Sequence, residues 1–308
     1  MTNSTLENEV REVLAWCRDV LGPVELDADD TREHPGLRSG SLRLRGASGL
    51  CSVKIHRDAG HWASEVHGYE QWAAAFGDRA PRLLAVRDEE PLALVISALP
   101  GKVLEEVQIS DDQQQAVWRA AGRALARLHD HAVGDFFGPV QRNGTYAGAP
   151  VTDAVEWVDY QFADWLERGT RIGALGRAEL EVVRAARELV PAFAGERPAP
   201  CHRDYCPANW LVTPGGAWTG VIDFEFSYWD VRAADFSRYP NWDWIDHPEW
   251  MAAFFEGYGR AFTPTEAQQH RAALALYALG AVAWGEENEY RIYAAEGRRA
   301  LEYLGKVI

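Results

Sequence analysis

The stretch CHRDYCPANWLV, which begins at Cys201, gathers several residue types that enzymes use for chemistry. His202, Asp204 and Asn209 are candidate acids, bases or ligands. Cys201 and Cys206 are candidate nucleophiles or metal ligands. A structural zinc site fits poorly, because the cysteines are five residues apart and no second Cys/His pair completes four ligands. A cysteine nucleophile needs a base and an electropositive setting, and neither is visible. The stretch therefore indicates a loop built around one carboxylate.

A second acid follows across a short predicted hairpin. Asp223 lies in the segment IDFE, fourteen residues after Asn209, and strand-like runs on both sides of the turn PGG fold the chain back. Asn209 and Asp223 would then offer oxygen ligands to a Mg²⁺ that bridges nucleotide phosphates. Asp204 would accept a proton from an attacking hydroxyl or orient it, and His202 would brace the loop by hydrogen bonds. The sequence therefore predicts nucleotide chemistry at this loop.

HRDYCPAN followed by IDFE resembles the catalytic and metal-binding loops of the protein-kinase-like superfamily, in the branch of aminoglycoside phosphotransferases and choline kinases. The pattern H-x-D-x-x-x-x-N then I-D-F-E at this spacing is highly specific, and the resemblance covers most of the chain. It implies an α+β, protein-kinase-like two-lobe fold, with a small β-rich N-lobe and a larger, mainly helical C-lobe. It also implies Mg²⁺ and ATP as cofactors, with GTP as the alternative nucleotide.

The elements that must position these loops change character near residues 97–101. Before that point, an amphipathic helix, a β-hairpin around the turn at Gly46, a helix over 61–76 and two further strands predict a β-rich region. After it, helical periodicity dominates and only a small hairpin interrupts it. We therefore expect a nucleotide-binding N-lobe over residues 1–100 and a catalytic, acceptor-binding C-lobe over residues 101–308.

The resemblance implies further residues on the nucleotide side. Lys54, in the strand-like SVKIH, would grip the α- and β-phosphates, although an exposed strand lysine is the alternative interpretation. Glu65 on the following helix would fix Lys54, with Glu70 as the fallback. SGS at 39–41, which departs from G-x-G-x-x-G, would be the turn that covers the phosphates, and LALVISALPG would join the lobes. Asp235 would support the catalytic loop from behind. The implied nucleotide contacts in these segments are Ser39, Ser41, Ser97, Ala98 and Leu99.

The formal net charge of the 308-residue chain is −15 at pH 7. This charge argues against a nucleic-acid partner, which would require a basic surface. It fits a cationic small-molecule acceptor, because acidic clefts concentrate cations, although simple solubility explains it equally well. No apolar run reaches the roughly 18 residues of a membrane span, and neither a signal peptide nor dense cysteines are visible. We expect a cytoplasmic monomer or homodimer without a membrane partner.

Two clusters in the helical region combine carboxylates with tryptophans, as sites for amines do. One is NWDWID, from Asn241, and the other is WGEENE, from Trp284. The alternative is that the tryptophans pack the core while the acids face water. We expect at least one cluster to line the cleft, with residues of an earlier helix on the opposite wall. The candidate acceptor contacts are Glu225, Asp243, Trp244, Glu286, Glu287, Trp157 and Asp159.

The sequence thus predicts a kinase that transfers the γ-phosphoryl group of ATP to a hydroxyl of a small, cationic acceptor. The leading hypothesis is a resistance-type antibiotic phosphotransferase for aminoglycosides or amine-bearing peptide or nucleoside antibiotics. The alternative is a metabolic kinase of choline, ethanolamine, an amino alcohol or a sugar. A protein kinase fits less well, because no Ala-Pro-Glu follows Asp223 and Cys206 stands where a lysine is usual. A non-catalytic binding protein is disfavoured, because the candidate lysine, acids and amide are all present.

Overall fold

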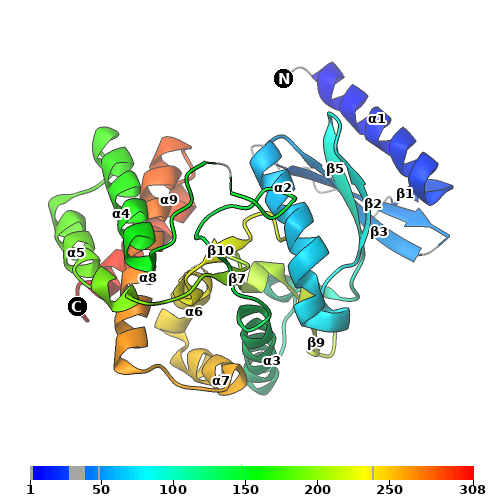
Figure 1. The fold of residues 1–308 in the computed structure, drawn as a ribbon. Helices are drawn as coiled ribbons and strands as arrows, with labels where there is room; N and C mark the ends of the chain where they lie inside the picture. Colours follow the sequence, from blue (N-terminus) through cyan, green and yellow to red (C-terminus); the bar gives the residue numbers. More distant parts are fainter. Residues whose placement is uncertain (1–2, 28–38, 48, 147, 238) are drawn as a thin grey trace.

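The computed structural model describes residues 3–27, 39–47, 49–146, 148–237 and 239–308. Figure 1 shows a part built around a β-sheet, from the first third of the chain, beside a mainly helical part from the remainder. The predicted α+β architecture with two unequal parts is therefore confirmed. Which part binds nucleotide and which binds acceptor stays a prediction.

A five-stranded sheet forms the first part, with the strand order β1-β2-β3-β5-β4 and antiparallel pairing of all neighbours. The helix α1 packs on one face of it, and α2 follows β3 on the other side (Figure 1). The elements of this part are α1 (Asn3–Leu21), β1 (Val24–Leu26), β2 (Ser39–Gly46), β3 (Gly49–His56), α2 (Ala59–His67), β4 (Leu83–Arg87) and β5 (Leu92–Ser97).

The strand β3 shows why the sheet presents chemistry on one face only. Successive side chains of a strand point to opposite faces. Cys51, Val53 and Ile55 accordingly belong to the core cluster shared with α1. Lys54 and His56, the alternate positions, are buried polar residues that contact α2 instead. The predicted hairpin around Gly46 is thus confirmed, and its period-2 pattern decides which face Lys54 occupies.

The predicted helix over 61–76 is confirmed as a continuous helical run, but its geometry changes along the way. After α2 the chain continues as a π-helical turn, η1 (Gly68–Trp72), and a 3₁₀ helix, η2 (Ala73–Arg79). At Gly68 the backbone comes close to the segment after Asp223, because a Cβ there would lie 2.6 Å from Ser227 Oγ. The chain can therefore approach the segment after Asp223 only through glycine.

The second part consists of helices and two small antiparallel sheets, with the strand orders β6-β8-β9 and β10-β7. One buried apolar cluster lies within it, and a second extends from it into the first part through residues such as Leu94 and Ile96. Its helices are η3 (Leu104–Glu106), α3 (Asp111–His129), α4 (Ala154–Arg171), α5 (Arg177–Arg187), η4 (Val190–Phe193), η5 (Pro207–Asn209), η6 (Arg232–Phe236), α6 (Tyr239–Asp246), α7 (Pro248–Tyr258), α8 (Pro264–Glu287) and α9 (Arg291–Leu304). Its strands are β6 (Lys102–Val103), β7 (Ala199–Cys201), β8 (Trp210–Val212), β9 (Trp218–Val221) and β10 (Tyr228–Asp230).

The long connection between α3 and α4 crosses from the helical part to α2 (Figure 1). His67 donates from Nδ1 to the carbonyl oxygen of Arg142 at 3.2 Å, and Ser64 Oγ lies 3.5 Å from the carbonyl oxygen of Val140. The guanidinium of Arg142 binds Glu70 at 2.9 Å. Glu70 is therefore engaged here, and it is not the partner of Lys54.

None of the described helices is both long enough and apolar enough to span a membrane. All four cysteines carry free thiols and are buried.

Candidate active site

Lys54 lies at the centre of a buried group of carboxylates. Its side chain projects from β3, and Nζ donates to Glu65 on α2 and to Asp223, each at 2.8 Å. Glu225, expected on the acceptor side, has Oε2 3.5 Å from the same nitrogen. The structure therefore brings Lys54, Glu65, Asp223 and Glu225 together, and acceptor contact by Glu225 stays a prediction.

The charges of this group determine its protonation. Burial would lower the pKa of Lys54, but the adjoining carboxylates outweigh burial and hold the pKa well above its usual value. Burial would likewise raise the pKa of Asp223, yet Lys54 keeps it below its ordinary value. Burial and the Asp223 charge raise the pKa of Glu225. Lys54 and Asp223 are thus a charged pair at neutral pH.

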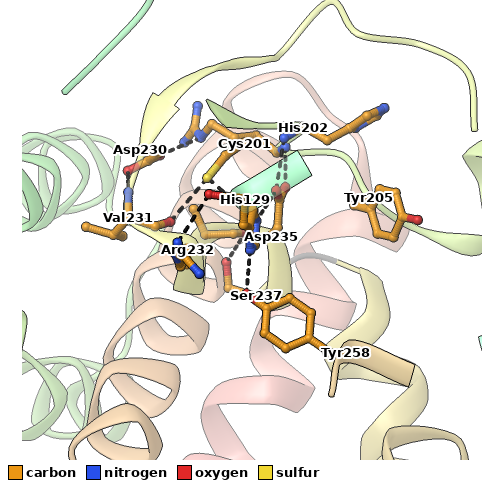
Figure 2. A network of polar contacts seen from close by, with 12 residues as sticks. His129, Cys201, His202, Tyr205, Asp230, Val231, Arg232, Asp235, Ser237 and Tyr258 are labelled. Carbon is orange, nitrogen blue, oxygen red and sulfur yellow. Dashed lines mark hydrogen bonds and ion pairs between the residues drawn. The ribbon is translucent and has the colours of Figure 1, made fainter. Parts of the chain in front are cut away.

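Asp235 supports the loop that carries Asp204. Its carboxylate accepts the backbone N–H of His202, at 2.9 Å, and that of Arg203 (Figure 2). Arg203 has a left-handed φ of 62°, and its guanidinium lies 2.8 Å from Asp230. Such a backbone conformation is unfavourable for a non-glycine residue, so these contacts are needed to hold the turn. Asp204 follows directly and is 9% exposed.

His202 joins the loop of Asp204 to the loop of Asp223. Its Nε2 donates to the carbonyl oxygen of Ile222 at 3.1 Å, and its Nδ1 accepts the N–H of Asp204 at 3.3 Å. Burial lowers its pKa, so the ring is neutral. Both nitrogens are occupied by the backbone and leave no position for proton transfer. These contacts fit the bracing role that the sequence predicts for His202, which is a positioning residue.

The β8–β9 hairpin brings Asn209 next to Asp223. The carbonyl oxygen of Asn209 accepts the N–H of Ile222 at 3.0 Å, one residue before Asp223. The side-chain Nδ2 of Asn209 donates to the carbonyl oxygen of Asp204 at 2.9 Å, which turns the amide oxygen away from that carbonyl. An amide oxygen and a carboxylate therefore come from neighbouring backbone positions. Oxygen donors of this kind fit Mg²⁺.

Cys206, which the sequence suggested only as a candidate nucleophile or metal ligand, contacts the candidate catalytic acid Asp204. Its Sγ is fully buried and lies 3.6 Å from Asp204 Oδ1, to which it donates. A hydrogen bond to one oxygen restricts how the carboxylate can rotate. Cys206 lies only two residues after Asp204, which could have indicated a contact between them. The direction of the thiol, however, depends on the loop conformation, which the sequence does not reveal.

The connection after β5 has fewer available backbone donors than expected. The N–H of Ser97 donates to the carbonyl oxygen of Arg82 at 2.9 Å, and that of Ala98 to Leu50 at 3.1 Å. These two N–H groups are therefore not available for a nucleotide base. Within the described chain, no such bond uses the N–H of Leu99, which is the remaining backbone donor of the three predicted positions.

Ser39 and Ser41 belong to a strand rather than to a turn. They lie in β2, opposite His56 and Lys54 of β3. The predicted turn at 39–41 is therefore wrong, because strand pairing continues to Ser39. The preceding connection between β1 and β2 contains residues 28–38, which lie outside the described residues. Phosphate contacts by the two serines stay predictions.

With this geometry established, the chain was compared with known families. The model of the phosphotransferase enzyme family matches residues 42–277. The chain belongs to this family. The predicted resemblance and the predicted enzyme class, a phosphotransferase, are thereby confirmed. A comparison with curated proteins finds no match.

Solved structures with the fold of this phosphotransferase include aminoglycoside phosphotransferases. The crystal structure of APH(4)-Ia has a TM-score of 0.73 at 15% identity and covers 96% of this chain and 98% of that chain. The GDP complex of aminoglycoside 2'-phosphotransferase-IIIa has a TM-score of 0.71 at 12% identity, with 97% and 99% covered. A putative aminoglycoside phosphotransferase from Ralstonia eutropha JMP134 has a TM-score of 0.63 at 14% identity, with 96% and 98% covered.

A row of carboxyl groups in the phosphotransferase begins at Asp204. Burial and the charge of Asp204 raise the pKa of Glu105, on the η3 turn after the junction of the two parts. Burial, Glu105 and further acids that include Glu296 raise the pKa of Asp243, on α6, to about 7. The η3 turn that carries Glu105 packs against η5, which begins three residues after Asp204. Asp243 was predicted, whereas Glu105 and Glu296 were missed. The two consecutive acids Glu105 and Glu106, shortly after the junction of the two parts, could have indicated an acidic site there.

Two tryptophans predicted to contact the acceptor are core residues of the phosphotransferase, so these predictions are wrong. Trp244 is 4% exposed, and its ring centroid lies 5.2 Å from that of Phe254 and 5.4 Å from that of Phe255. Trp157 is equally buried, and its Nε1 donates to Asp230 at 2.7 Å. Apolar burial outweighed the tendency of tryptophan to line amine sites.

Three acids predicted to contact the acceptor form ion pairs with arginines. Asp159 accepts two hydrogen bonds from Arg187, at 2.6 and 2.8 Å. Glu286 accepts one from Arg298 at 2.7 Å, and Glu287 binds an arginine of α4. In the described part of the chain, none of these contacts connects them with Asp204, so acceptor binding by these acids stays a prediction.

Proposed function

We propose that this phosphotransferase transfers the γ-phosphoryl group of ATP, or of GTP, to a hydroxyl of a small cationic acceptor. The observation that carries the proposal is the convergence of Lys54, Asp223, Asn209 and Asp204, which come from three separate segments. A lysine, two oxygen ligands and a carboxylate are the groups that phosphoryl transfer requires.

Each group has a distinct role in this proposal. Lys54, held by Glu65, binds nucleotide phosphates and balances charge on them. Asp204, nearly buried and oriented by Cys206 and the loop backbone, accepts a hydrogen bond from the acceptor hydroxyl and takes its proton. Leu99 offers a backbone N–H to the base of the nucleotide.

Asn209 and Asp223 would hold Mg²⁺, and the ion would neutralise charge on the phosphates when bound. Their donor set fits the ion, because both side chains offer oxygen and the Asn209 amide nitrogen is already used by Asp204. The low pKa of Asp223, held by Lys54 against the effect of burial, keeps its carboxylate ionised and able to bind a cation.

The acceptor is proposed to carry amino groups. Support comes from the neighbouring carboxyl groups Glu105 and Asp243 and from the net charge of −15. Similar structures include ternary complexes of aminoglycoside phosphotransferases with hygromycin B. An antibiotic with several amines is our leading proposal, and a metabolic amino alcohol such as choline is the alternative. The use of ATP and the presence of reduced thiols both fit an enzyme that works in the cytoplasm.

The experiment is a panel of aminoglycosides, amine-bearing peptide and nucleoside antibiotics, choline, ethanolamine and neutral sugars, incubated with Mg²⁺ and ATP or GTP. Mass spectrometry detects an acceptor that gains one phosphoryl group. We expect product from a polyamine acceptor. Product from neutral sugars alone would contradict the acceptor class, and no product together with no nucleotide binding would contradict the function.

A further inference from the structure

A cavity of about 330 Å³ lies among η4, η6, α7 and α8, and none of the residues placed around Lys54 or Asp204 lines it. This volume is at the lower end of the range for small-molecule sites. Aromatic side chains of Phe236, Phe255 and Phe262 form part of the wall, together with Tyr258. The walls also contain ionisable residues, so the cavity combines an apolar surface with a few polar groups.

Glu196 is an acid of this cavity wall whose two hydrogen-bond donors in the described chain carry no charge. Its Oε1 accepts the backbone N–H of Arg232 at 2.9 Å, and its Oε2 accepts the side-chain amide of Gln269 at 2.9 Å. Both donors are neutral. Burial, helped by the charges of Asp230 and Glu266, raises the pKa of Glu196 to about 7, although the backbone N–H and the guanidinium of Arg232 oppose this rise.

The two arginines of the cavity wall are engaged elsewhere. Arg260 pairs with Glu266. Arg232 lies 2.9 Å from Asp130 and donates to a backbone carbonyl of α3 at 3.2 Å. Among the described contacts, therefore, no cationic side chain donates to the carboxylate of Glu196. A cation that entered the cavity would supply this missing partner.

We propose that this cavity is a second ligand site, which takes a primary amine carried on a compact aromatic or apolar body. The ammonium pairs with Glu196, and the body packs against Phe236, Phe255 and Phe262. Aromatic faces attract cations, so the same wall favours both ends of such a ligand. This site is separate from the acceptor site at Asp204 and goes beyond the proposed function.

Buried hydrogen bonds connect the cavity with the catalytic loop (Figure 2). The hydroxyl of Tyr258 lies 2.8 Å from His129 Nδ1, and His129 Nε2 donates to Asp235 at 2.9 Å. Burial lowers the pKa of His129, so the ring is neutral and Tyr258 must be the donor to Nδ1. Asp235 anchors the N–H groups that precede Asp204. A ligand that shifts Tyr258 therefore changes the support of the catalytic loop.

The binding test uses benzylamine as the probe and benzyl alcohol as its neutral analogue, titrated by calorimetry. We expect saturable benzylamine binding to the wild type and to the control Glu89→Gln, on a surface turn, and at least tenfold weaker binding to Glu196→Gln. Benzyl alcohol should bind at least tenfold more weakly than benzylamine. Equal benzylamine affinity of wild type and Glu196→Gln overturns the site. Preference for benzyl alcohol or benzoate overturns the ligand class.

The coupling test uses Tyr258→Phe, which keeps the ring and removes the hydroxyl. Benzylamine should change the kcat of the wild type by at least twofold without competing with the acceptor, and this effect should vanish in Tyr258→Phe while calorimetric binding persists. An unchanged kcat, or the same change in both proteins, overturns the coupling. The calorimetric result stands even if no acceptor is phosphorylated, so failure of this site and failure of the proposed function are distinguishable.

Discussion

Arg203 and Asp223 have positive φ angles of 62° and 70°. Arg203 directly precedes Asp204, and Asp223 is itself a carboxylate of the candidate site. A non-glycine residue in this region costs on the order of 1–3 kcal/mol. The cost is offset by buried contacts, because Asp235 accepts the N–H of Arg203 and Lys54 binds the side chain of Asp223. The positions of Asp204 and Asp223 therefore depend on contacts with Asp235 and Lys54.

Glu105 is the acid that tests whether the row of carboxyls selects the acceptor. Glu105→Gln removes one negative charge near Asp204, so KM for a polyamine acceptor should rise roughly two- to fivefold, as expected for an exposed ion pair. The kcat should change little, and KM for a neutral acceptor should not change. Steady-state kinetics of Glu105→Gln and of the control Glu89→Gln measures both. A similar rise of KM for cationic and neutral acceptors would remove the electrostatic explanation.

Asp243 should give acceptor binding a pH dependence near neutrality. Its pKa is raised to about 7, chiefly by burial and by Glu105, so the carboxyl becomes neutral as the pH falls through that value. A cationic acceptor binds the ionised form, and its KM should therefore rise between pH 7.5 and 6. In Asp243→Asn, KM should be higher at pH 7.5 and flatter across this interval. An identical profile in both proteins would show that Asp243 does not contribute.

At the residue scale, spacing along the chain predicted Asp204, Asn209 and Asp223, because one loop and one short hairpin hold all three. The same reasoning failed for Trp244, whose burial depends on α7, and for Glu105, whose neighbour Asp204 is distant in sequence. Side chains whose surroundings come from other elements leave little trace in the local pattern.

At the scale of elements, α2 is held from three sides. Lys54 of β3 binds Glu65, Phe224 and Ser227 pack against Gly68 at its end, and backbone carbonyls of the connection after α3 accept hydrogen bonds from the helix. Ser227 Oγ also lies 3.4 Å from the carbonyl oxygen of Ser64. The helix therefore fixes the Lys54–Glu65 pair relative to the segment that carries Asp223.

Gly68→Ala should separate α2 from this segment. Its Cβ would lie 2.6 Å from Ser227 Oγ and 3.1 Å from the Cβ of Phe224, which is too close without movement. We expect about 1–3 kcal/mol less stability from overpacking, and a lower kcat because Glu65 and Asp223 shift relative to Lys54. Denaturant unfolding and kinetics measure the two effects. Gly215→Ala, where the nearest atom is 3.7 Å from the new Cβ, is the control that should stay close to wild type.

Element type was largely predictable, and element ends were not. Alternation predicted the hairpin of β2 and β3, but the strand pairing that extends β2 to Ser39 was invisible because its polar residues resembled a turn. Helical periodicity predicted the helical run over 61–76, but not its change to π-helical and 3₁₀ geometry after His67. Ends depend on tertiary packing, which local pattern does not contain.

At the scale of the whole molecule, the candidate active site lies where the two parts meet. Lys54 and Asp223 are 169 residues apart and form a 2.8 Å hydrogen bond. Stability of the assembled fold also depends on histidines that are buried in their neutral form. Burial lowers the pKa of His129 and His202, and it lowers that of His270 to about 4.

His270 should make the protein less stable in acid. In the unfolded chain its pKa is about 6.5, whereas in the folded protein it is about 4, so the unfolded state binds more protons between these values. The contribution is fully present above pH 6.5 and is lost as the pH falls towards 4, by roughly 2–3 kcal/mol. Glu196 and Asp243, with pKa values raised to about 7, act in the opposite direction.

The comparison with His270→Phe isolates this contribution, because the acids are common to both proteins. The free energy of unfolding in urea should fall less between pH 7.5 and 5 in the variant than in the wild type, by about 2 kcal/mol. Parallel pH profiles would mean that His270 is protonated equally in the folded and unfolded states.

The most direct test of the central claim is the rate of phosphoryl transfer by Asp204→Asn, with nucleotide binding measured on the same protein. Because the amide cannot take a proton, kcat should fall by about 10²- to 10⁴-fold. Binding of ATP with Mg²⁺ should stay within a factor of a few, since Lys54, Asn209 and Asp223 are unchanged. Transfer at the wild-type rate by Asp204→Asn would contradict the account.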